Sequence, residues 1–184
     1  AGITLPDGGA IRVDDRDIEG RRFVIATGSR PALPPIEGLE AAGPITSDDA
    51  FSLERLPAEL LVLGGGPIGL ELAQAYARLG SRVTVVLRGE RILPREDRDL
   101  ADALMASLAD EGVVFRTGLE PLRAERDGDR RRLLCRGADG EVTLEGDQLL
   151  VATGRTPNID GLGLETAGVA YDARGGIAVD ARCR

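Results

Sequence analysis

The spacing of apolar residues changes twice between positions 60 and 87. Residues 60–63 are all apolar, as expected for a strand that is buried on both faces. Residues 67–79 then carry apolar side chains at helical spacing, and Gly80 provides a helix stop. A second apolar run covers residues 83–87. The pattern predicts a strand, a helix and a second strand, which is the order found in units of parallel sheet.

Each of two predicted helices has an apolar face. In the helix at 67–79 this face consists of Ile68, Leu72, Ala75, Tyr76 and Leu79. A second helix is predicted from about 95 to 111, with an apolar face made of Leu100, Leu104 and Leu108. Short strands are predicted at 113–115 and 148–152, where apolar runs recur.

Antiparallel structure is predicted in other parts of the chain. Residues 119–146 alternate strand-like runs with turns, which predicts an antiparallel β-meander lying over the parallel sheet. A hairpin is predicted around the turn at 6–9, and a further strand at 22–26. Residues 29–58 lack periodicity and contain several prolines, so we expect them to connect two domains.

Three glycines separate the first buried strand from its helix. Gly64, Gly66 and Gly69 have the G-x-G-x-x-G spacing of dinucleotide-binding turns. The first permits a tight turn, the second lets a pyrophosphate approach the backbone, and the third allows close packing of helix and strand. The positions between them are Gly65, Pro67 and Ile68. The helix directs its free N–H groups and positive dipole end toward the phosphates.

The alternative is a glycine-rich turn that has only a structural role in an ordinary α/β protein. The strand before the glycines and the helix after them favour dinucleotide binding instead. We therefore expect a Rossmann-like α/β domain of three layers, with a parallel sheet, helices on one face and the antiparallel meander on the other.

Composition excludes several classes of function. The formal net charge of −8 argues against nucleic-acid binding, which needs a basic surface. No apolar stretch reaches the length of a membrane span. The chain has no histidine, so a histidine base or a histidine-rich metal site is excluded, and no metal is predicted. Cys135 and Cys183 lie far apart in the sequence, as expected for reduced thiols of a cytoplasmic protein.

Two segments of the chain resemble each other. Residues 24–31 read VIATGSRP, and residues 150–157 read LVATGRTP. We interpret them as similar strand exits from two related dinucleotide folds. Coincidence is the alternative, because a strand followed by glycine is common.

The order of these motifs resembles that of a known family. ATGSRP at 26–31, GGGPIGLE at 64–71 and LVATGRTPN at 150–158 are similar to motifs of the class I pyridine nucleotide-disulfide oxidoreductases. The mercuric reductase-like and dihydrolipoamide dehydrogenase-like members are the most similar. The family's flavin fingerprint, its redox cysteine pair and its dimerisation domain with a catalytic histidine are not found in this sequence.

The resemblance implies an excised domain of the FAD/NAD(P)-binding type. Residues 1–47 would be a flavin-domain remnant with a linker, residues 48–153 the NAD(P)-binding domain, and residues 154–184 the return segment into the flavin domain. The parent would be a cytoplasmic homodimer that uses FAD. Its flavin and dimerisation domains would be the partners of this chain.

The resemblance also implies roles for further residues. Glu71 would help to position the nicotinamide, although an acid near the positive end of a helix has a purely structural explanation as well. Gly154 would let the backbone approach the nicotinamide half. Leu119 would contact the adenine side, and core packing explains it equally well. The family's flavin-contacting turn is matched by Thr27, Gly28 and Ser29.

The coenzyme is expected to be NADP rather than NAD. An acid at the end of the second strand would bind the ribose hydroxyls, whereas an arginine would meet a 2′-phosphate. Leu87 stands where dihydrolipoamide dehydrogenases usually have the acid, and Arg88 aligns with the arginine of NADP-dependent relatives. Arg91 and Arg95 can add positive charge, while Glu90 is close enough to act as a late acid.

The resemblance thus implies a chain that binds NAD(P)H and positions the nicotinamide for hydride transfer to FAD in an intact oxidoreductase. No catalytic residue is predicted within the chain, and we expect it to be inactive alone. The alternative is a self-contained dinucleotide-binding or redox-sensing module without turnover. A protein that uses the glycine turn for FAD alone is less favoured, because this turn comes second in the order of motifs.

Overall fold

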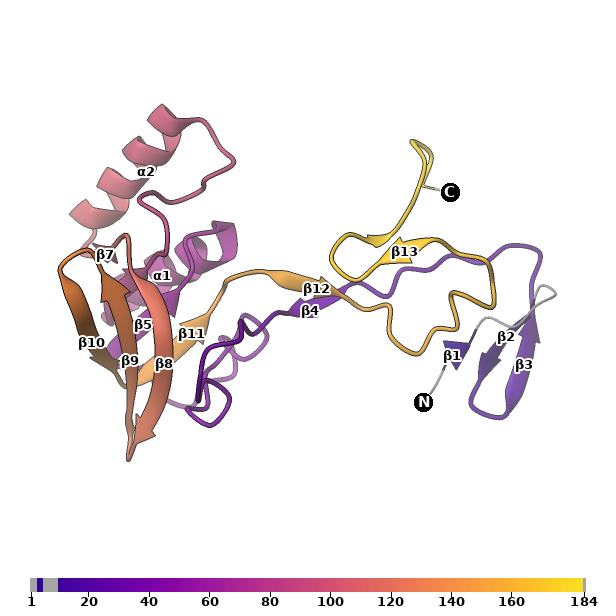
Figure 1. The fold of residues 1–184 in the computed structure, drawn as a ribbon, viewed down its shortest axis with the longest axis horizontal. Coiled ribbons are helices and arrows are strands. Elements are labelled where there is room, and N and C mark those ends of the chain that lie inside the picture. Colours follow the sequence, from indigo (N-terminus) through magenta and orange to yellow (C-terminus); the bar gives the residue numbers. More distant parts are fainter. Residues whose placement is uncertain (1–2, 5–9, 184) are drawn as a thin grey trace. The chain divides into compact units, whose positions relative to one another are not determined.

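The fold is described by a computed structural model, which covers residues 3–4 and 10–183 (Figure 1). The chain divides into two compact units. One unit is Pro31–Gly154, and the other combines Ala1–Arg30 with Arg155–Arg184. The predicted domain limits at 47/48 and 153/154 stay a prediction.

The centre of the larger unit is a sheet of four strands that are all parallel. Their spatial order is β11 (Gln148–Val151), β5 (Glu59–Leu63), β6 (Arg82–Val86) and β7 (Val114–Arg116). The two central strands are β5 and β6, and their apolar residues 60–63, Val83, Val85 and Val86 are buried as the apolar runs predicted. All four strands end at the same edge of the sheet, because they run in the same direction.

Two helices pack with one face of this sheet. They are α1 (Pro67–Leu79) and α2 (Arg98–Asp110). Side chains alternate across a strand, so Leu60 and Val62 pack with the helices in one buried cluster, while Leu61 and Leu63 belong to a second cluster. This second cluster includes Leu133 of the antiparallel meander.

The meander forms the third layer of the unit. Its strands are β8 (Glu120–Asp127), β9 (Arg130–Gly137) and β10 (Gly140–Gly146), in the order β10-β9-β8. A β-bulge shifts the register of β8 and β9 between Pro121 and Arg123. The predicted three-layer α/β fold, with parallel sheet, helices and meander, is confirmed.

The predicted helical faces were partly wrong. The buried residues of α1 are Gly69, Leu70, Leu72, Ala73 and Tyr76, whereas Ile68 is 37% exposed and Leu79 is 68% exposed. In α2 the buried residues are Ala101 and Leu108, while Leu100 and Leu104 are exposed. The contact of α1 with the sheet therefore combines a close backbone approach at Gly69 with the buried side chains of Leu70, Leu72 and Tyr76.

The segment between positions 31 and 58 is part of the larger unit. Leu39 and Ala42 are buried against the meander side of the sheet. Ile45 forms a parallel bridge with Leu150, and its N–H donates to the carbonyl of Leu149 at 2.8 Å. The hydroxyl of Tyr76 on α1 donates to the buried carbonyl of Ala50 at 2.5 Å. The segment therefore packs on both faces of the sheet, although its sequence shows no periodicity.

Ion pairs connect the meander to the amino ends of the parallel strands. Glu59, at the start of β5, accepts from Arg82 at 2.6 Å and also forms an ion pair with Arg130 of β9. Arg130 donates to Asp147 at 2.8 Å, and Asp147 in turn accepts from the backbone N–H of Glu59 at 2.9 Å. These bonds use the charged groups at this edge of the sheet to hold two layers together.

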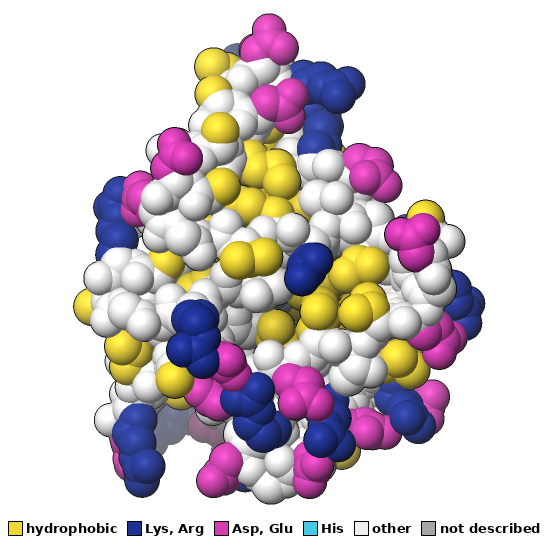
Figure 2. Space-filling view, turned by 90° about the vertical axis from the view of Figure 1, so that its left-hand side faces the viewer, with side chains coloured by type: hydrophobic (Ala, Val, Ile, Leu, Met, Phe, Trp, Pro, Cys, Tyr) yellow, Lys and Arg dark blue, Asp and Glu magenta, His cyan; other side chains and the backbone are white. Residues whose placement is uncertain are grey.

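An apolar surface lies on the side of the larger unit that carries α2, β7 and β10. Figure 2 shows this side, with hydrophobic side chains grouped near its centre and charged side chains around them. The exposed large apolar residues of these three elements are Leu100, Leu104, Val114 and Val142.

The smaller unit is built from short paired strands. Its first sheet contains β1 (Ile3–Thr4), β2 (Ala10–Val13) and β3 (Arg16–Glu19). A second pair consists of β4 (Ser29–Pro31) and β12 (Arg155–Pro157), and a third of β13 (Tyr171–Asp172) and β14 (Gly176–Ile177).

Two predictions for this unit have different outcomes. The pairing of β1 with β2 confirms the hairpin, although its predicted turn at 6–9 lies outside the described residues. The strand predicted at 22–26 was wrong, because no described segment pairs with these residues and Val24 is 90% exposed. A strand needs a hydrogen-bonded neighbour, which the apolar run by itself does not provide.

Candidate nucleotide-binding site

The glycine turn lies at the carboxyl edge of the parallel sheet, between β5 and α1. Gly64 has a φ of 117°, a conformation that favours glycine. A Cβ atom at Gly64 would lie 2.5 Å from the carbonyl oxygen of Ala152, and one at Gly69 would lie 2.5 Å from the carbonyl oxygen of Gly64. These two glycines are therefore required by close packing, and Ala152 is the unpredicted residue against which the turn packs.

Gly66 has a different environment. A Cβ atom at this position would meet nothing within 4 Å in the described structure. Gly66 is the N-cap of α1, and no side chain caps the helix. By helix geometry the N–H groups of Gly66, Ile68 and Gly69 have no carbonyl partner within the helix, and Pro67 has no N–H to satisfy. The turn thus offers free backbone donors beside open space, which is the arrangement that binds phosphate groups.

Gly65 is covered by the loop that follows β6. The space of its missing side chain is filled by Leu87, whose Cδ2 lies 2.3 Å from a Cβ built there, and by Ile92. The N–H of Leu93 donates to the carbonyl oxygen of Gly65 at 2.9 Å. This loop therefore contacts the glycine turn directly. The apolar periodicity of the sequence gave no signal for this contact.

Gly154 follows β11 at the same edge of the sheet. It is exposed, and a Cβ atom there would also meet nothing within 4 Å in the described structure. The N–H of Ala152 donates to the carbonyl of Leu63 at 2.9 Å, which joins the end of β11 to the end of β5. Gly154 therefore extends from the strand end that packs against the glycine turn.

Glu71 is exposed and is the fifth residue of α1. The first turn of this helix contains no acidic residue. Because the helix dipole acts mainly within the first turn, the purely structural explanation accounts poorly for an acid at position 71. The exposed carboxylate of Glu71 is accessible to a ligand.

The residues that are predicted to determine coenzyme preference lie at the end of β6. Leu87 is 4% exposed, whereas the side chain of Arg88 is 79% exposed and lies 4.0 Å from Glu120. A Cβ atom on Gly118 would lie 2.8 Å from Oε1 of Glu90, so this carboxylate is placed over the Gly118 backbone. The exposed basic group at the strand end is thus only weakly paired.

Leu119 has a clear structural role. Its side chain is partly buried against the meander cluster, and its N–H donates to the carbonyl of Leu87 at 2.9 Å. The N–H group is therefore engaged within the fold. These contacts give Leu119 a packing role, and its backbone contact with the adenine side stays a prediction.

Thr27, Gly28 and Ser29 pair with the similar segment near residue 155. The hydroxyl of Thr27 donates to the carbonyl of Asn158 at 2.6 Å, and the Asn158 amide donates to the carbonyl of Thr27 at 2.9 Å. The N–H of Asn158 donates to the carbonyl of Gly28 at 3.0 Å. Arg155 donates to the hydroxyl of Ser29 at 2.7 Å. The repeated ATG segments thus pair with each other, and the repeat is the signal that could have identified Arg155 and Asn158 as partners.

The two cysteines are free thiols. Cys135 is fully buried in the meander cluster, and burial raises the pKa of its thiol to about 11. This thiol is therefore protonated and inert at neutral pH. Cys183 is exposed. Within residues 3–4 and 10–183, no cluster of three or more potential ligands could hold a metal ion, and no helix is long and apolar enough to span a membrane.

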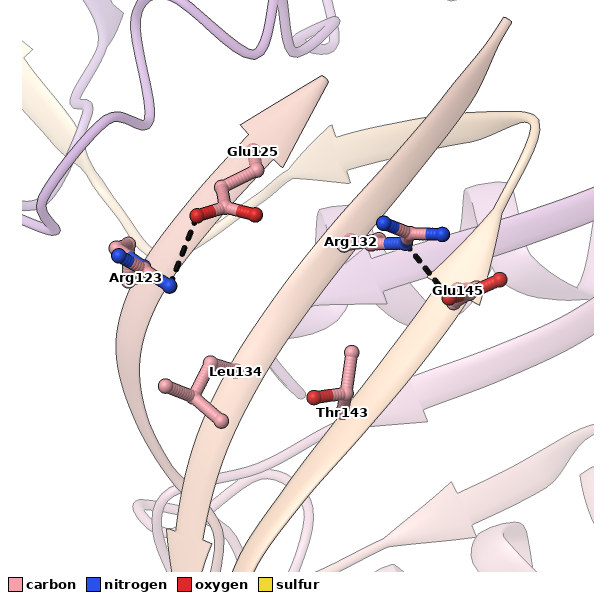
Figure 3. Close-up of a pocket in the computed structure, with 6 residues that line it drawn as sticks. All are labelled: Arg123, Glu125, Arg132, Leu134, Thr143 and Glu145. Carbon is pink, nitrogen blue, oxygen red and sulfur yellow. Dashed lines mark hydrogen bonds and ion pairs between the residues drawn. The ribbon is translucent and has the colours of Figure 1, made fainter. Parts of the chain in front are cut away.

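A shallow hollow of about 350 Å³ lies on the meander, away from the glycine turn. Figure 3 shows its lining side chains on β8, β9 and β10, with one ion pair along β8 and one between β9 and β10. Arg123 contacts Glu125 at 2.9 Å, and Arg132 contacts Glu145 at 2.7 Å. The four charged side chains of the hollow are thus paired with one another, so we take the glycine turn as the candidate site.

The sequence of residues 4–184 matches the family described as pyridine nucleotide-disulphide oxidoreductase. The chain belongs to this family. A mercuric reductase of Streptomyces lividans is 40% identical over 178 residues, which cover 97% of this chain and 36% of the relative. A dihydrolipoyl dehydrogenase of Thermus scotoductus is 42% identical over 176 residues, which cover 94% of this chain and 38% of the relative.

Solved structures agree with this assignment. The HOCl-induced flavoprotein disulfide reductase RclA of Escherichia coli, solved as a Cu(II) complex, superposes with a TM-score of 0.88 at 34% identity. The superposition covers 98% of this chain and 41% of that protein. The expected family and fold are thus confirmed. The chain spans between a third and two fifths of the length of the two curated relatives described above.

Proposed function

We propose that this chain binds the pyrophosphate of NAD(P)H at the glycine turn and positions the nicotinamide toward a flavin. The single observation that carries the proposal is the open space at Gly66, next to helix N–H groups that have no partner in the helix. The amides of Gly66, Ile68 and Gly69 would hold the phosphates. Gly65 and Pro67 would shape the turn, and Gly64 would fix its approach to β11.

Gly154 and Glu71 would contact the nicotinamide half of the coenzyme. The backbone of Gly154 has the space for a close approach, and the carboxylate of Glu71 is exposed on α1. Bound NAD(P)H supplies a hydride, and the protein contributes by holding the ring in one orientation. Leu119 would contact the adenosine side of the coenzyme, next to the end of β6 to which its N–H is bonded.

We also propose that NADP is preferred over NAD. The exposed guanidinium of Arg88 would meet the 2′-phosphate, while the buried Leu87 offers no acceptor to a ribose hydroxyl. Arg88→Glu should reverse the preference, because the new carboxylate repels the phosphate and can accept from the ribose. Calorimetric titration of wild type and Arg88→Glu with NADPH and NADH tests this expected change in preference. Unchanged relative affinities would contradict the role of Arg88.

The wider activity belongs to the same proposal. We propose that the chain serves a flavoprotein disulfide reductase, mercuric reductase-like or dihydrolipoamide dehydrogenase-like, in which Thr27, Gly28 and Ser29 contact FAD. The chain alone would not reduce disulfides, since the buried Cys135 and the exposed Cys183 form no redox pair and the sequence has no histidine. A non-catalytic dinucleotide-binding module is the competing function. Both functions predict coenzyme binding, and only the first predicts that bound NAD(P)H reduces a flavin supplied with the rest of such a protein.

A further inference from the structure

Arg91 lies in the loop between β6 and α2, but its side chain is directed into the loop itself. Its Nη2 donates to the carbonyl oxygen of Pro94 at 2.6 Å, and its Nη1 makes a longer bond of 3.4 Å to the carbonyl oxygen of Glu96. The residue is half-buried. One guanidinium thus spans the turn at 93–96, which is also closed by the N–H of Glu96 donating to the carbonyl of Leu93 at 3.0 Å.

The turn that Arg91 spans is also the part of the loop that contacts the glycine turn. Leu93 donates to Gly65, as described above, and it does so from a left-handed conformation with a φ of 44°. This conformation is unfavourable for a leucine, so surrounding contacts must hold it. Ile92, which covers Gly65, is fully buried. The arginine therefore stabilises a strained segment whose backbone is bonded to the candidate site.

We propose that Arg91 is a positioning residue, which fixes the loop that forms the adenosine side of the coenzyme site, and that it does not bind the 2′-phosphate. The inference rests on the proposed function. The guanidinium of Arg91 is already directed to two carbonyl oxygens of its own loop, whereas Arg88 has only a carboxylate partner at 4.0 Å. The two arginines therefore differ in role: Arg88 distinguishes NADPH from NADH, and Arg91 supports both coenzymes equally.

The test compares Arg91→Ala with wild type in the full chain, using NADPH, NADH, 2′,5′-ADP and 5′-AMP in calorimetric titrations. Loss of the clamp should weaken all four ligands by a similar factor, about tenfold. The ratio of NADPH to NADH affinity should stay within about twofold of wild type. Arg91→Lys should restore part of the affinity, because an ammonium can donate to both carbonyls.

A matched control removes the same charge from outside the loop. Arg98→Ala on α2 breaks an ion pair with Asp102 and should leave all four affinities unchanged. A second readout needs no ligand. Hydrogen exchange of the Leu93 amide should accelerate in Arg91→Ala and remain slow in Arg98→Ala, because only the first variant releases the turn.

The outcomes separate this inference from the proposed function. Selective loss of NADPH and 2′,5′-ADP in Arg91→Ala, with NADH and 5′-AMP unaffected, would make Arg91 a phosphate ligand and overturn the inference alone. Unchanged affinities together with unchanged exchange at Leu93 would overturn it as well. Absence of coenzyme binding in the wild-type chain would overturn the proposed function, even if exchange at Leu93 still depended on Arg91.

Discussion

The two edges of the parallel sheet differ in whether their polar groups have partners within the fold. At the amino edge, Glu59, Arg82, Arg130 and Asp147 bond to one another and join the sheet to the meander. At the carboxyl edge, the N–H groups that open α1 have no capping side chain, and Gly66 borders open space. The amino edge therefore stabilises the fold, whereas the carboxyl edge keeps unpaired donors at the place where open α/β sheets generally bind ligands.

The carboxyl edge contains a glycine that close packing requires, Gly64, and a glycine that borders open space, Gly66. Substitution of these two glycines should give the largest difference in stability. Gly64→Ala should lower the free energy of unfolding by roughly 3 kcal/mol, because the new Cβ collides with the backbone of Ala152 and φ is positive. Urea unfolding measures this. Gly66→Ala is the matched control and should cost less than about 1 kcal/mol, since its Cβ enters open space. Equal midpoints for the two variants would contradict the packing role of Gly64.

Gly66→Ala should nevertheless damage binding. Its methyl group would occupy the space proposed for the pyrophosphate, so the affinities for NADPH and NADH should both fall at least about tenfold. Calorimetric titration of the folded variant measures the loss. Wild-type affinity in this variant would show that phosphates do not approach the backbone at Gly66.

A substitution at the amino edge should lower stability without changing coenzyme affinity. Hydrogen bonds from Arg82 and Arg130 lower the pKa of Glu59 below its usual 4.5. Glu59→Gln should reduce the thermal midpoint by about 2 °C at neutral pH and leave coenzyme affinity unchanged. The contribution of Glu59 is present above its unfolded pKa and is lost as pH falls through the lower folded pKa. Thermal scans should therefore show the two proteins converging below about pH 4.5.

The control for this variant is at the other edge. Arg88→Gln removes only an exposed ion pair of 4.0 Å, so its thermal midpoint should match that of wild type. If Glu59→Gln weakened coenzyme binding as well, the two edges would not be separate in function.

The sequence predicted the elements of the larger unit more accurately than their contacts. The spacing of Gly64, Gly66 and Gly69 located the turn, and α1 has the predicted bounds. The buried face of α1 was predicted correctly at Leu72 and Tyr76, but the face is rotated toward Gly69, Leu70 and Ala73, because Gly69 packs directly against the backbone of Gly64. Spacing alone also did not distinguish a glycine required for packing from one beside open space.

Other contacts depend on residues distant in the sequence. The strand expected at 22–26 needed a neighbouring strand, which no local pattern reveals. The bond from Leu93 to Gly65 crosses from one loop to another, and the role of Arg91 depends on it. Conversely, the repeated ATG segments were recognised in the sequence, but only the structure places them side by side as β4 and β12.

The most direct test of the central claim is a titration of the isotopically labelled chain with NADPH, followed through backbone amide signals by NMR. We expect the largest shifts at Gly64, Gly65, Gly66, Ile68 and Gly69, with the signals of Glu59 and Arg130 unchanged. Saturable shifts centred on the meander hollow, or no shifts at the glycine turn while the chain remains folded, would contradict the central claim.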